Sequence, residues 1–287
     1  MKYESLELNP ETRKSLPGQF IKLSKGYVHY EIKGHKEGEV VVLVHGFSSP
    51  LLVWDNNFEI LAEERFRVLR YDLYGRGYTD RPMVRYDLDL FDQQLYELLE
   101  KLELSNINIV GLSMGGGITV VFANRHPDLV KRITLIDPIG LPTEKDTFPS
   151  FLKIPVLNRF LVKFIGHKRI LNGQRDDFIE YDRIEEYLTE FSKQMMYKGF
   201  LRSIRSTLVN VPFTGLKDYY KRLGDKKLPI QLFWGEKDPV IPYSTSREVC
   251  ALIPSIKFHT IKDCGHMPQY TQPDKVNSLL IDFLRST

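Results

Sequence analysis

The sequence lacks the features that mark disulfide-rich, membrane-spanning and secreted proteins. Its 287 residues contain only two cysteines, Cys250 and Cys264, which excludes a disulfide framework and a four-cysteine metal site. No run of apolar residues reaches the ~18 that are needed to span a bilayer. The first ten residues contain no hydrophobic stretch of the kind found in a secretory signal. We therefore expect a cytoplasmic protein with two reduced thiols.

An excess of charge of one sign is also missing. The 40 Lys and Arg residues nearly balance the 37 Asp and Glu residues, which leaves a net charge of +3. This balance excludes an overall nucleic-acid-binding signature, so we expect no nucleic-acid partner. The sequence contains neither a G-x-x-x-x-G-K phosphate loop nor an H-E-x-x-H zinc motif. With 42% hydrophobic and 27% charged residues, the composition is typical of a globular protein with a large core.

Short apolar runs alternate with longer amphipathic stretches along the chain. Apolar residues recur on one helical face at 91, 95, 98 and 102, and again from 276 to 284. Strands that alternate with helices predict βαβ units. We expect an α/β fold with a mostly parallel, doubly wound central sheet and helices on both faces. The strands are expected at residues 19–24, 27–33, 40–44, 66–71, 107–110, 133–136, 229–234 and 256–261.

Residues 141–228 interrupt this alternation. They contain no strong strand pattern but several helical faces, one of which consists of Ile184, Leu188, Phe191 and Met195. We predict a core made of residues 1–141 and 229–287, with residues 142–228 as a helical insertion between two strands of its sheet. Between positions 145 and 227 there are 17 Lys and Arg against 10 Asp and Glu, so the insertion carries the positive charge.

The most informative motif is Gly-Leu-Ser-Met-Gly at residues 111–115. It directly follows a predicted buried strand and opens an apolar helix. In a G-x-S-x-G elbow the chain turns sharply from strand to helix, and the flanking glycines leave room for the turn. The Ser113 hydroxyl then lies at a helix N-terminus, where developing negative charge is favoured. We predict that Ser113 is a catalytic nucleophile.

A serine nucleophile needs a base and a group that orients the base. Among seven histidines, His266 lies in the loop between the last strand and the last helix, at the sheet edge where Ser113 is expected. Asp238 follows another strand at the same edge, in a loop punctuated by glycine and proline. We predict that His266 is the base and Asp238 the acid, with Asp137 and Glu236 as alternative acids. The chain order nucleophile, acid, base is that of the elbow enzymes.

The same chemistry needs two backbone N–H groups directed at the oxyanion that develops during attack. Met114, the residue after the nucleophile, is expected to supply one of them. The second is expected from the loop after an early buried strand, where His45, Gly46 and Phe47 follow residues 40–44. We predict the Phe47 N–H as the second donor and a structural role for His45.

These motifs make the sequence similar to the α/β-hydrolase fold superfamily, in its group with a helical cap. The residues that carry the resemblance are His45-Gly46-Phe47, residues 71–77, 111–115 and 234–238, and Gly265-His266. The resemblance covers the chain from about residue 20 to its end. It implies that Ser113, Asp238 and His266 form a triad and that the insertion is a cap, or lid, over the active site. It also implies hydrolysis through an acyl-enzyme, which requires no metal and no organic cofactor.

The resemblance and the residues favour the hydrolysis of carboxylic esters. Leucine and aromatic residues in the insertion predict an apolar pocket, which suits medium-chain or aryl acyl groups and monoglyceride-like substrates. A serine at the elbow argues against epoxide hydrolases and haloalkane dehalogenases, which carry aspartate there. Carbon–carbon bond hydrolases are an alternative, although Leu112 and Met267-Pro268-Gln269-Tyr270 depart from the Asn before the serine and the Trp after the histidine that are usual there. A perhydrolase, an acyltransferase and a non-catalytic small-ligand receptor are further alternatives.

The segment from residue 151 to 171 is apolar and basic and has no acidic residue. The simpler interpretation is a cap helix that packs its apolar face on the core and exposes its lysines. The alternative is peripheral contact of the cap with an anionic lipid surface. The expected partner is a small-molecule ester.

Overall fold

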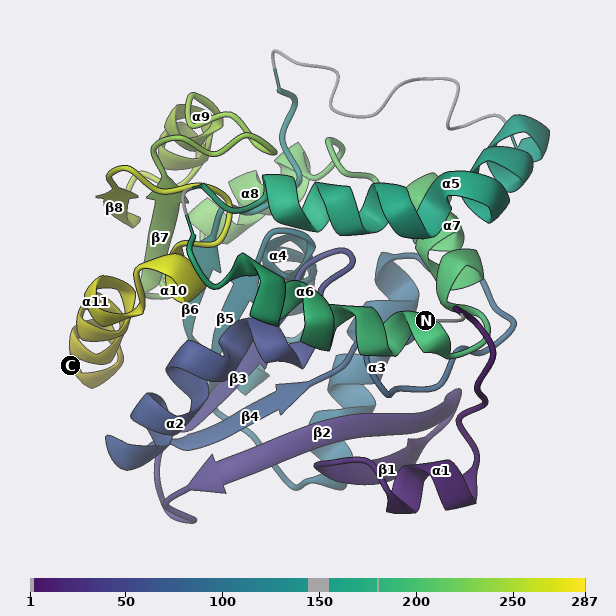
Figure 1. Ribbon diagram of the computed structural model, residues 1–287. Coiled ribbons are helices and arrows are strands. Elements are labelled where there is room, and N and C mark those ends of the chain that lie inside the picture. The colour runs from purple at the N-terminus through teal and green to yellow at the C-terminus, as the bar shows by residue number, and fades with distance from the viewer. Residues whose placement is uncertain (1–2, 144–154, 180, 287) are drawn as a thin grey trace.

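The computed structural model describes residues 3–143, 155–179 and 181–286, and for residues 155–165 it describes the backbone only. An eight-stranded sheet lies at its centre (Figure 1). The expectation of an α/β fold with a mostly parallel central sheet is confirmed. The strands are β1 (Gln19–Leu23), β2 (Gly26–Gly34), β3 (Val40–Val44), β4 (Arg67–Tyr71), β5 (Ile107–Leu112), β6 (Val130–Ile136), β7 (Ile230–Gly235) and β8 (Lys257–Ile261).

The order of the strands brings the loops after β5, β7 and β8 to one edge of the sheet. The order is β1-β2-β4-β3-β5-β6-β7-β8, and within it the strands from β4 to β8 run parallel to one another. Only β1 and β2 add antiparallel pairs, at the other margin of the sheet. Because parallel strands share the edge at which their carboxyl ends lie, side chains that follow several strands meet there.

The two faces of the sheet are covered by different helices. Helices α2 (Asp55–Glu63) and α11 (Pro273–Arg285) pack together on one face, and α3 (Leu88–Lys101) and α4 (Met114–Arg125) on the other (Figure 1). Strand β3 is buried along its whole length: Val40, Val42 and Val44 join one core cluster, whereas Val41 and Leu43 join the other. Side chains alternate along a strand, so an unbroken apolar run is the pattern of a strand that is buried on both faces.

Four longer helices follow one another between β6 and β7. They are α5 (Pro155–Asp176), α6 (Ile184–Lys193), α7 (Phe200–Asn210) and α8 (Lys217–Gly224). Within the described part of residues 141–228, every regular element is a helix. Helices α5 to α7 lie over the end of the sheet at which β5 and β7 end, whereas α8 packs against α4 (Figure 1). The division into a core of residues 1–141 and 229–287 and a cap of residues 142–228 stays a prediction.

Short helices complete the chain. They are α1 (Pro10–Lys14), η1 (Leu51–Trp54), η2 (Pro127–Leu129), η4 (Gln194–Met196), α9 (Thr245–Leu252) and α10 (Pro268–Thr271). Across the described ranges, no helix is both long and apolar enough to cross a membrane. The lipid contact considered for residues 151–171 concerns a segment of which only residues 166–171 have described side chains, so it also stays a prediction.

Candidate active site

Ser113 lies at the turn between β5 and α4. Its backbone angles are φ 54° and ψ −115°, in a region that residues with side chains rarely adopt. The Ser113 N–H donates to the carbonyl of Ile136 at 2.8 Å, and the Ser113 carbonyl accepts from the N–H groups of Gly117 at 3.2 Å and Ile139 at 3.1 Å. These backbone hydrogen bonds hold the serine in its strained conformation.

Two glycines allow the main chain to pass close to itself at this turn. A Cβ atom at Gly115 would collide with the carbonyl oxygen of Val44 in the neighbouring strand β3. A Cβ atom at Gly111 would collide with the carbonyl oxygen of Gly115. Because the obstructing atoms belong to the backbone, no side-chain rotation relieves the contact. The spacing of the glycines around Ser113 therefore follows from the geometry of the turn.

His266 and Asp238 lie in the loops that follow β8 and β7. Their atoms Nδ1 and Oδ2 are 2.7 Å apart, and both side chains are buried. The other carboxylate oxygen of Asp238 accepts from the N–H groups of Val240 at 2.7 Å and Ile241 at 2.9 Å. The loop thus fixes the Asp238 carboxylate and leaves one oxygen for the imidazole ring.

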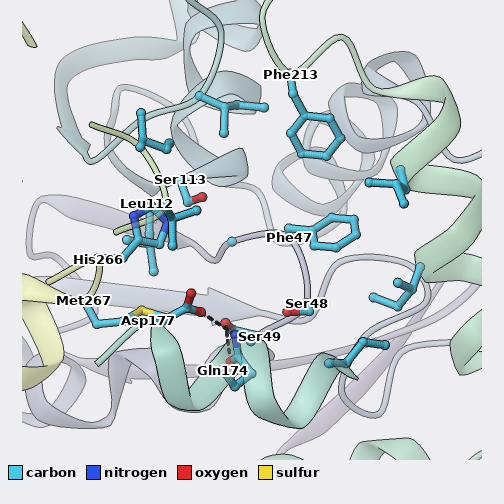
Figure 2. A pocket seen from close by; sticks show the side chains of 18 of the residues that line it. Phe47, Ser48, Ser49, Leu112, Ser113, Gln174, Asp177, Phe213, His266 and Met267 are labelled. Atoms are coloured by element: carbon cyan, nitrogen blue, oxygen red, sulfur yellow. Dashed lines mark hydrogen bonds between the residues drawn. The ribbon is translucent and has the colours of Figure 1, made fainter. Parts of the chain in front are cut away.

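Ser113 and His266 line the same pocket, and their side chains lie next to each other in Figure 2. In the part of the chain that the structure describes, no hydrogen bond joins the Ser113 hydroxyl to the ring. Catalytic hydrogen bonds are often loose before substrate is bound and tighten in the complex. The two side chains are positioned to interact around a reacting group.

The two alternative acids are placed very differently. Asp137 follows β6, is fully buried, and accepts the N–H of Gly235 at 2.8 Å. One ligand atom each of Asp137, Asp238 and His266 lies within 4.8 Å of the others. Glu236 is exposed on the surface. The geometry favours Asp238, since its Oδ2 contacts Nδ1 of the His266 ring at 2.7 Å.

The charges at this edge of the sheet are coupled. Burial opposes the charge on His266, but Asp238 outweighs it, and the pKa of His266 rises to about 9. Burial and the nearby Asp238 raise the pKa of Asp137 well above its usual value. A protonated Asp137 relieves the repulsion between two buried carboxylates. The arrangement therefore places the Asp238 carboxyl group beside a strongly basic imidazole.

Phe47 and Met114, the two predicted oxyanion donors, lie on the loop after β3 and at the start of α4. Met114 is the first residue of α4, so its N–H is one of those that a helix leaves unpaired at its start. Phe47 lines the pocket on the loop after β3. Within the described ranges, neither of these two N–H groups has a hydrogen-bond partner. In the described structure, both N–H groups can therefore bind a further acceptor.

His45 holds the loop that carries Phe47. It is fully buried, its Nδ1 lies 2.9 Å from the carbonyl oxygen of Gly46, and its Nε2 accepts the N–H of Leu73 at 2.9 Å. Burial lowers the pKa of His45 to about 4, so the ring is neutral at neutral pH. A neutral ring that donates through Nδ1 and accepts through Nε2 satisfies both contacts.

Arg76 supports the same loop from the other side. It is fully buried, and its guanidinium donates to the carbonyl oxygens of Phe47 at 2.8 Å and Tyr74 at 3.2 Å. A third bond of 2.9 Å reaches the hydroxyl of Thr207 on α7. Among the described residues no carboxylate pairs with Arg76, and burial lowers its pKa to about 9. Arg76 thus links the loop after β3 to a helix of the insertion.

The pocket has a volume of about 320 Å³ and lies between the core loops and helices α5 and α7. Much of its wall is apolar and includes Leu112, Ile139, Ile204, Leu208 and Phe213. Figure 2 shows Phe47 and Phe213 on one side of Ser113, and their rings meet edge to face at 5.6 Å.

Beneath His266 the pocket wall is polar, which the sequence pattern does not predict. Gln174, near the end of α5, and Asp177, just after it, face the pocket together with Ser49 (Figure 2). In the sequence, this polar wall is indicated by one feature: Gln174 and Asp177 are three residues apart, a spacing that puts two side chains on the same side of a helix. Such pairs are common on exposed helices, so the spacing alone does not indicate a site.

A family model described as the alpha/beta hydrolase fold matches residues 39–165 and 168–273 of this chain. A 2-hydroxy-6-oxononadienedioate/2-hydroxy-6-oxononatrienedioate hydrolase from Cupriavidus pinatubonensis is 27% identical over 286 residues, which cover 93% of this chain and 94% of that protein. Together the two matches extend over most of the chain.

Solved structures resemble this chain along almost its whole length. The enol-lactonase from Burkholderia xenovorans superposes with a TM-score of 0.80 at 20% identity, covering 93% of this chain and 100% of its own. A thermophilic esterase from Thermogutta terrifontis superposes with a TM-score of 0.79 at 23% identity, covering 93% and 98%. At these identities the likeness is one of fold.

Proposed function

The chain belongs to the alpha/beta hydrolase fold family, and we propose that within it the protein is a serine hydrolase that cleaves carboxylic esters with apolar acyl groups. The observation that carries the proposal is the 2.7 Å contact between His266 Nδ1 and Asp238 Oδ2, in loops that border the pocket lined by Ser113. An oriented base beside a serine on a strained turn is the arrangement that nucleophilic acyl transfer needs.

The proposed reaction begins with attack by Ser113. Its Oγ forms a bond to the ester carbonyl carbon while its proton moves to Nε2 of His266. The N–H groups of Phe47 and Met114 donate to the oxyanion that results. Asp238 keeps the ring in the correct tautomer and stabilises its positive charge. The carbon–oxygen bond to the alcohol then breaks, and His266 returns the proton to the departing oxygen.

Water completes the cycle by the same steps. It gives a proton to His266 as its oxygen attacks the acyl carbon, and Ser113 leaves with that proton when the acid is released. Each oxyanion donor is expected to lower the barrier by about 3 kcal/mol, which corresponds to roughly 100-fold in rate. The main-chain donors are fixed by the folds of their loops, so they need no reorganisation during the reaction.

The apolar part of the pocket supports the proposed acyl preference. Ile204 and Leu208 of α7 and Phe213 beyond it contribute apolar surface near Phe47. Burial of apolar surface gains roughly 25 cal/mol per Å², so each additional methylene that fits is expected to strengthen binding. A pocket of about 320 Å³ lies within the size range of small-molecule sites.

The test is the hydrolysis of p-nitrophenyl esters with acyl chains from two to sixteen carbons, by the intact protein and by Ser113→Ala. We expect an optimum at medium chain length and a loss in kcat of roughly a million-fold in the variant. Equal turnover by Ser113→Ala would contradict the serine nucleophile. A Cys264→Ser variant is the matched control, because its thiol lies near His266 in sequence but points to Thr271, 3.2 Å away.

The hydrolysis of carbon–carbon bonds is the second candidate. It is favoured by the name of the relative from Cupriavidus pinatubonensis, which covers nearly the whole chain. The intact protein and Ser113→Ala are therefore also assayed on a vinylogous 1,5-diketone of the type formed by ring cleavage. Turnover of the diketone by the intact protein without turnover of any ester would overturn the esterase proposal. Loss of that turnover in Ser113→Ala would show that the carbon–carbon bond hydrolysis depends on Ser113.

A further inference from the structure

The polar wall beneath His266 is organised around the side-chain amide of Gln174. Its Oε1 accepts two hydrogen bonds, from the hydroxyl of Ser49 at 3.1 Å and from the hydroxyl of Tyr187 at 2.7 Å. Both Gln174 and Tyr187 are buried. The other end of the amide lies 2.6 Å from a carboxylate oxygen of Asp177, which only accepts when it is charged, so that end is the NH₂ group and Oε1 faces the two hydroxyls.

The NH₂ group of Gln174 donates to Oδ2 of Asp177 at 2.6 Å (Figure 2). The direction of the whole network is thereby set, since Ser49 and Tyr187 donate to Gln174 and Gln174 donates to Asp177. Asp177 is the terminal acceptor, and its half-buried carboxylate lines the pocket. A carboxylate held in this way presents its remaining lone pairs to whatever occupies the pocket.

The position of Asp177 relative to the base is also fixed. The backbone N–H of His266 donates to the backbone carbonyl of Asp177 at 3.0 Å. A protonated His266 must reach the alcohol oxygen of the ester in order to release it. The part of the substrate next to His266 is therefore the alcohol, whereas Phe47 and Phe213 lie on the other side of Ser113 (Figure 2).

We propose that Asp177 binds a hydrogen-bond donor on the alcohol part of the ester, so that the substrates are apolar acyl esters of polyols or amino alcohols. The inference rests on the proposed function and adds to it the identity of the leaving group. The hydroxyl or ammonium group beyond the ester oxygen donates to the free oxygen of Asp177, while Gln174 holds the other oxygen. Gln174 is thus a positioning residue that acts through Asp177.

The test compares matched octanoate esters that differ only in the alcohol. Propyl octanoate carries no donor, hydroxyethyl octanoate carries a hydroxyl, and dimethylaminoethyl octanoate carries a protonated amine with one N–H. Choline octanoate carries the charge without the N–H. We expect kcat/KM to be higher for the two donor esters than for propyl octanoate by about 10- to 100-fold, the range for a hydrogen bond to a charged group.

The variant is Asp177→Asn, and its matched control is Asp176→Asn at the exposed neighbouring position. In Asp177→Asn the amide oxygen accepts from Gln174 and an NH₂ group faces the pocket. We expect the ratio of dimethylaminoethyl to propyl turnover to fall by about tenfold in Asp177→Asn, because the protonated amine can only donate, and to stay unchanged in Asp176→Asn. An unchanged ratio in Asp177→Asn would overturn the inference.

A measurement on the unaltered protein covers the case in which Asp177→Asn does not fold. Burial raises the pKa of Asp177 to about 7, although His266 opposes the rise. The ratio of dimethylaminoethyl to propyl turnover is expected to fall as the pH drops through 7, because Asp177 loses its charge. The pKa of His266 is about 9, so its titration lies above this pH range. The other titratable groups near Asp177 are Asp238, Asp176 and Tyr187, and Arg169 lines the same pocket.

The outcomes separate this inference from the proposed function. Loss of all ester turnover, p-nitrophenyl esters included, would contradict the serine esterase. Turnover of every octanoate with no preference among the alcohols, or a preference for choline octanoate equal to that for dimethylaminoethyl octanoate, would contradict only the donor site at Asp177.

Discussion

The elbow at Ser113 and the polar wall at Gln174 and Asp177 border one pocket but are built by opposite means. The elbow is built by close contacts between main-chain segments, since a methyl group at Gly115 would collide with the Val44 carbonyl. On the wall a helix end carries side chains, and apart from the backbone of α5 and the adjacent residues no described atom lies within 4 Å of a Cβ built at Gly173. The first region tolerates almost no change, whereas the second has room for it.

This difference separates two tasks of the proposed enzyme. The nucleophile and the oxyanion donors depend on backbone geometry, which is costly to alter and the same for every ester. The choice of alcohol depends on side chains that a single substitution changes. A family of this fold can therefore keep one reaction while its substrates diverge. Four predictions test how far the two regions are independent.

The largest effect is expected at the acid. Asp238→Asn removes the charge that stabilises protonated His266 and disturbs the tautomer of its ring, so kcat is expected to fall by about 10⁴-fold. Asp137→Asn keeps the acceptor for the Gly235 N–H and is expected to lose less than about tenfold. Steady-state rates on a p-nitrophenyl ester measure both. A larger loss in Asp137→Asn would identify Asp137 as the acid.

The pH profile provides the second comparison. His266 must be neutral to accept the serine proton, and its pKa of about 9 means that kcat/KM rises with pH up to about 9. The gain between pH 7 and 9 is expected to be about 50-fold, because the neutral fraction of the ring rises from about 1% to about half. In Asp238→Asn the rise in kcat/KM is expected to shift to lower pH. In Asp177→Asn the shift is expected to be small. An apparent pKa near about 6.5 for this rise in the unaltered protein would contradict the electrostatic coupling between His266 and Asp238.

The third prediction concerns the stability of the elbow. Gly115→Ala forces a methyl group against the carbonyl oxygen of Val44, so the free energy of unfolding is expected to fall by at least about 3 kcal/mol. Urea denaturation followed by circular dichroism measures the change. Unaltered stability would mean that β3 and α4 can separate without loss, which the buried packing of both elements argues against.

The smallest effect is expected on the cap. Gly173→Ala places a methyl group in open space within α5, where glycine is a poor helix former. The free energy of unfolding is expected to rise by up to about 1 kcal/mol. The same denaturation experiment serves as the counterpart of Gly115→Ala. A loss of stability at Gly173 would show that the two regions are equally constrained.

The sequence predicted the parts of the site that the backbone determines. The apolar runs of β3 and β5 mark strands buried on both faces, and the glycines around Ser113 mark a turn that side chains would block. His266 and Asp238 follow strands, so the topology alone brings them to one edge. Their contact of 2.7 Å agrees with that expectation, while their catalytic roles stay predictions.

Asp177 escaped prediction for a physical reason. Its place depends on how α5 crosses the sheet edge, and the path of a helix over a core is set by tertiary packing that a local pattern does not encode. The pattern around Gln174 is that of an exposed basic helix, although Gln174 is only 4% exposed in the fold. Its amide also contacts the hydroxyl of Tyr187, thirteen residues further along the chain.

The bond from Arg76 to Thr207 has a consequence for protein engineering. A chimaera that receives its cap from a relative would replace Thr207 while keeping Arg76 and the loop of Phe47. If the relative's cap has no hydroxyl at that position, one guanidinium N–H of the fully buried Arg76 loses its acceptor. The free energy of unfolding would then fall by about 1–3 kcal/mol. Grafts that retain α7 with the recipient should therefore fold more readily than grafts that exchange the entire insertion.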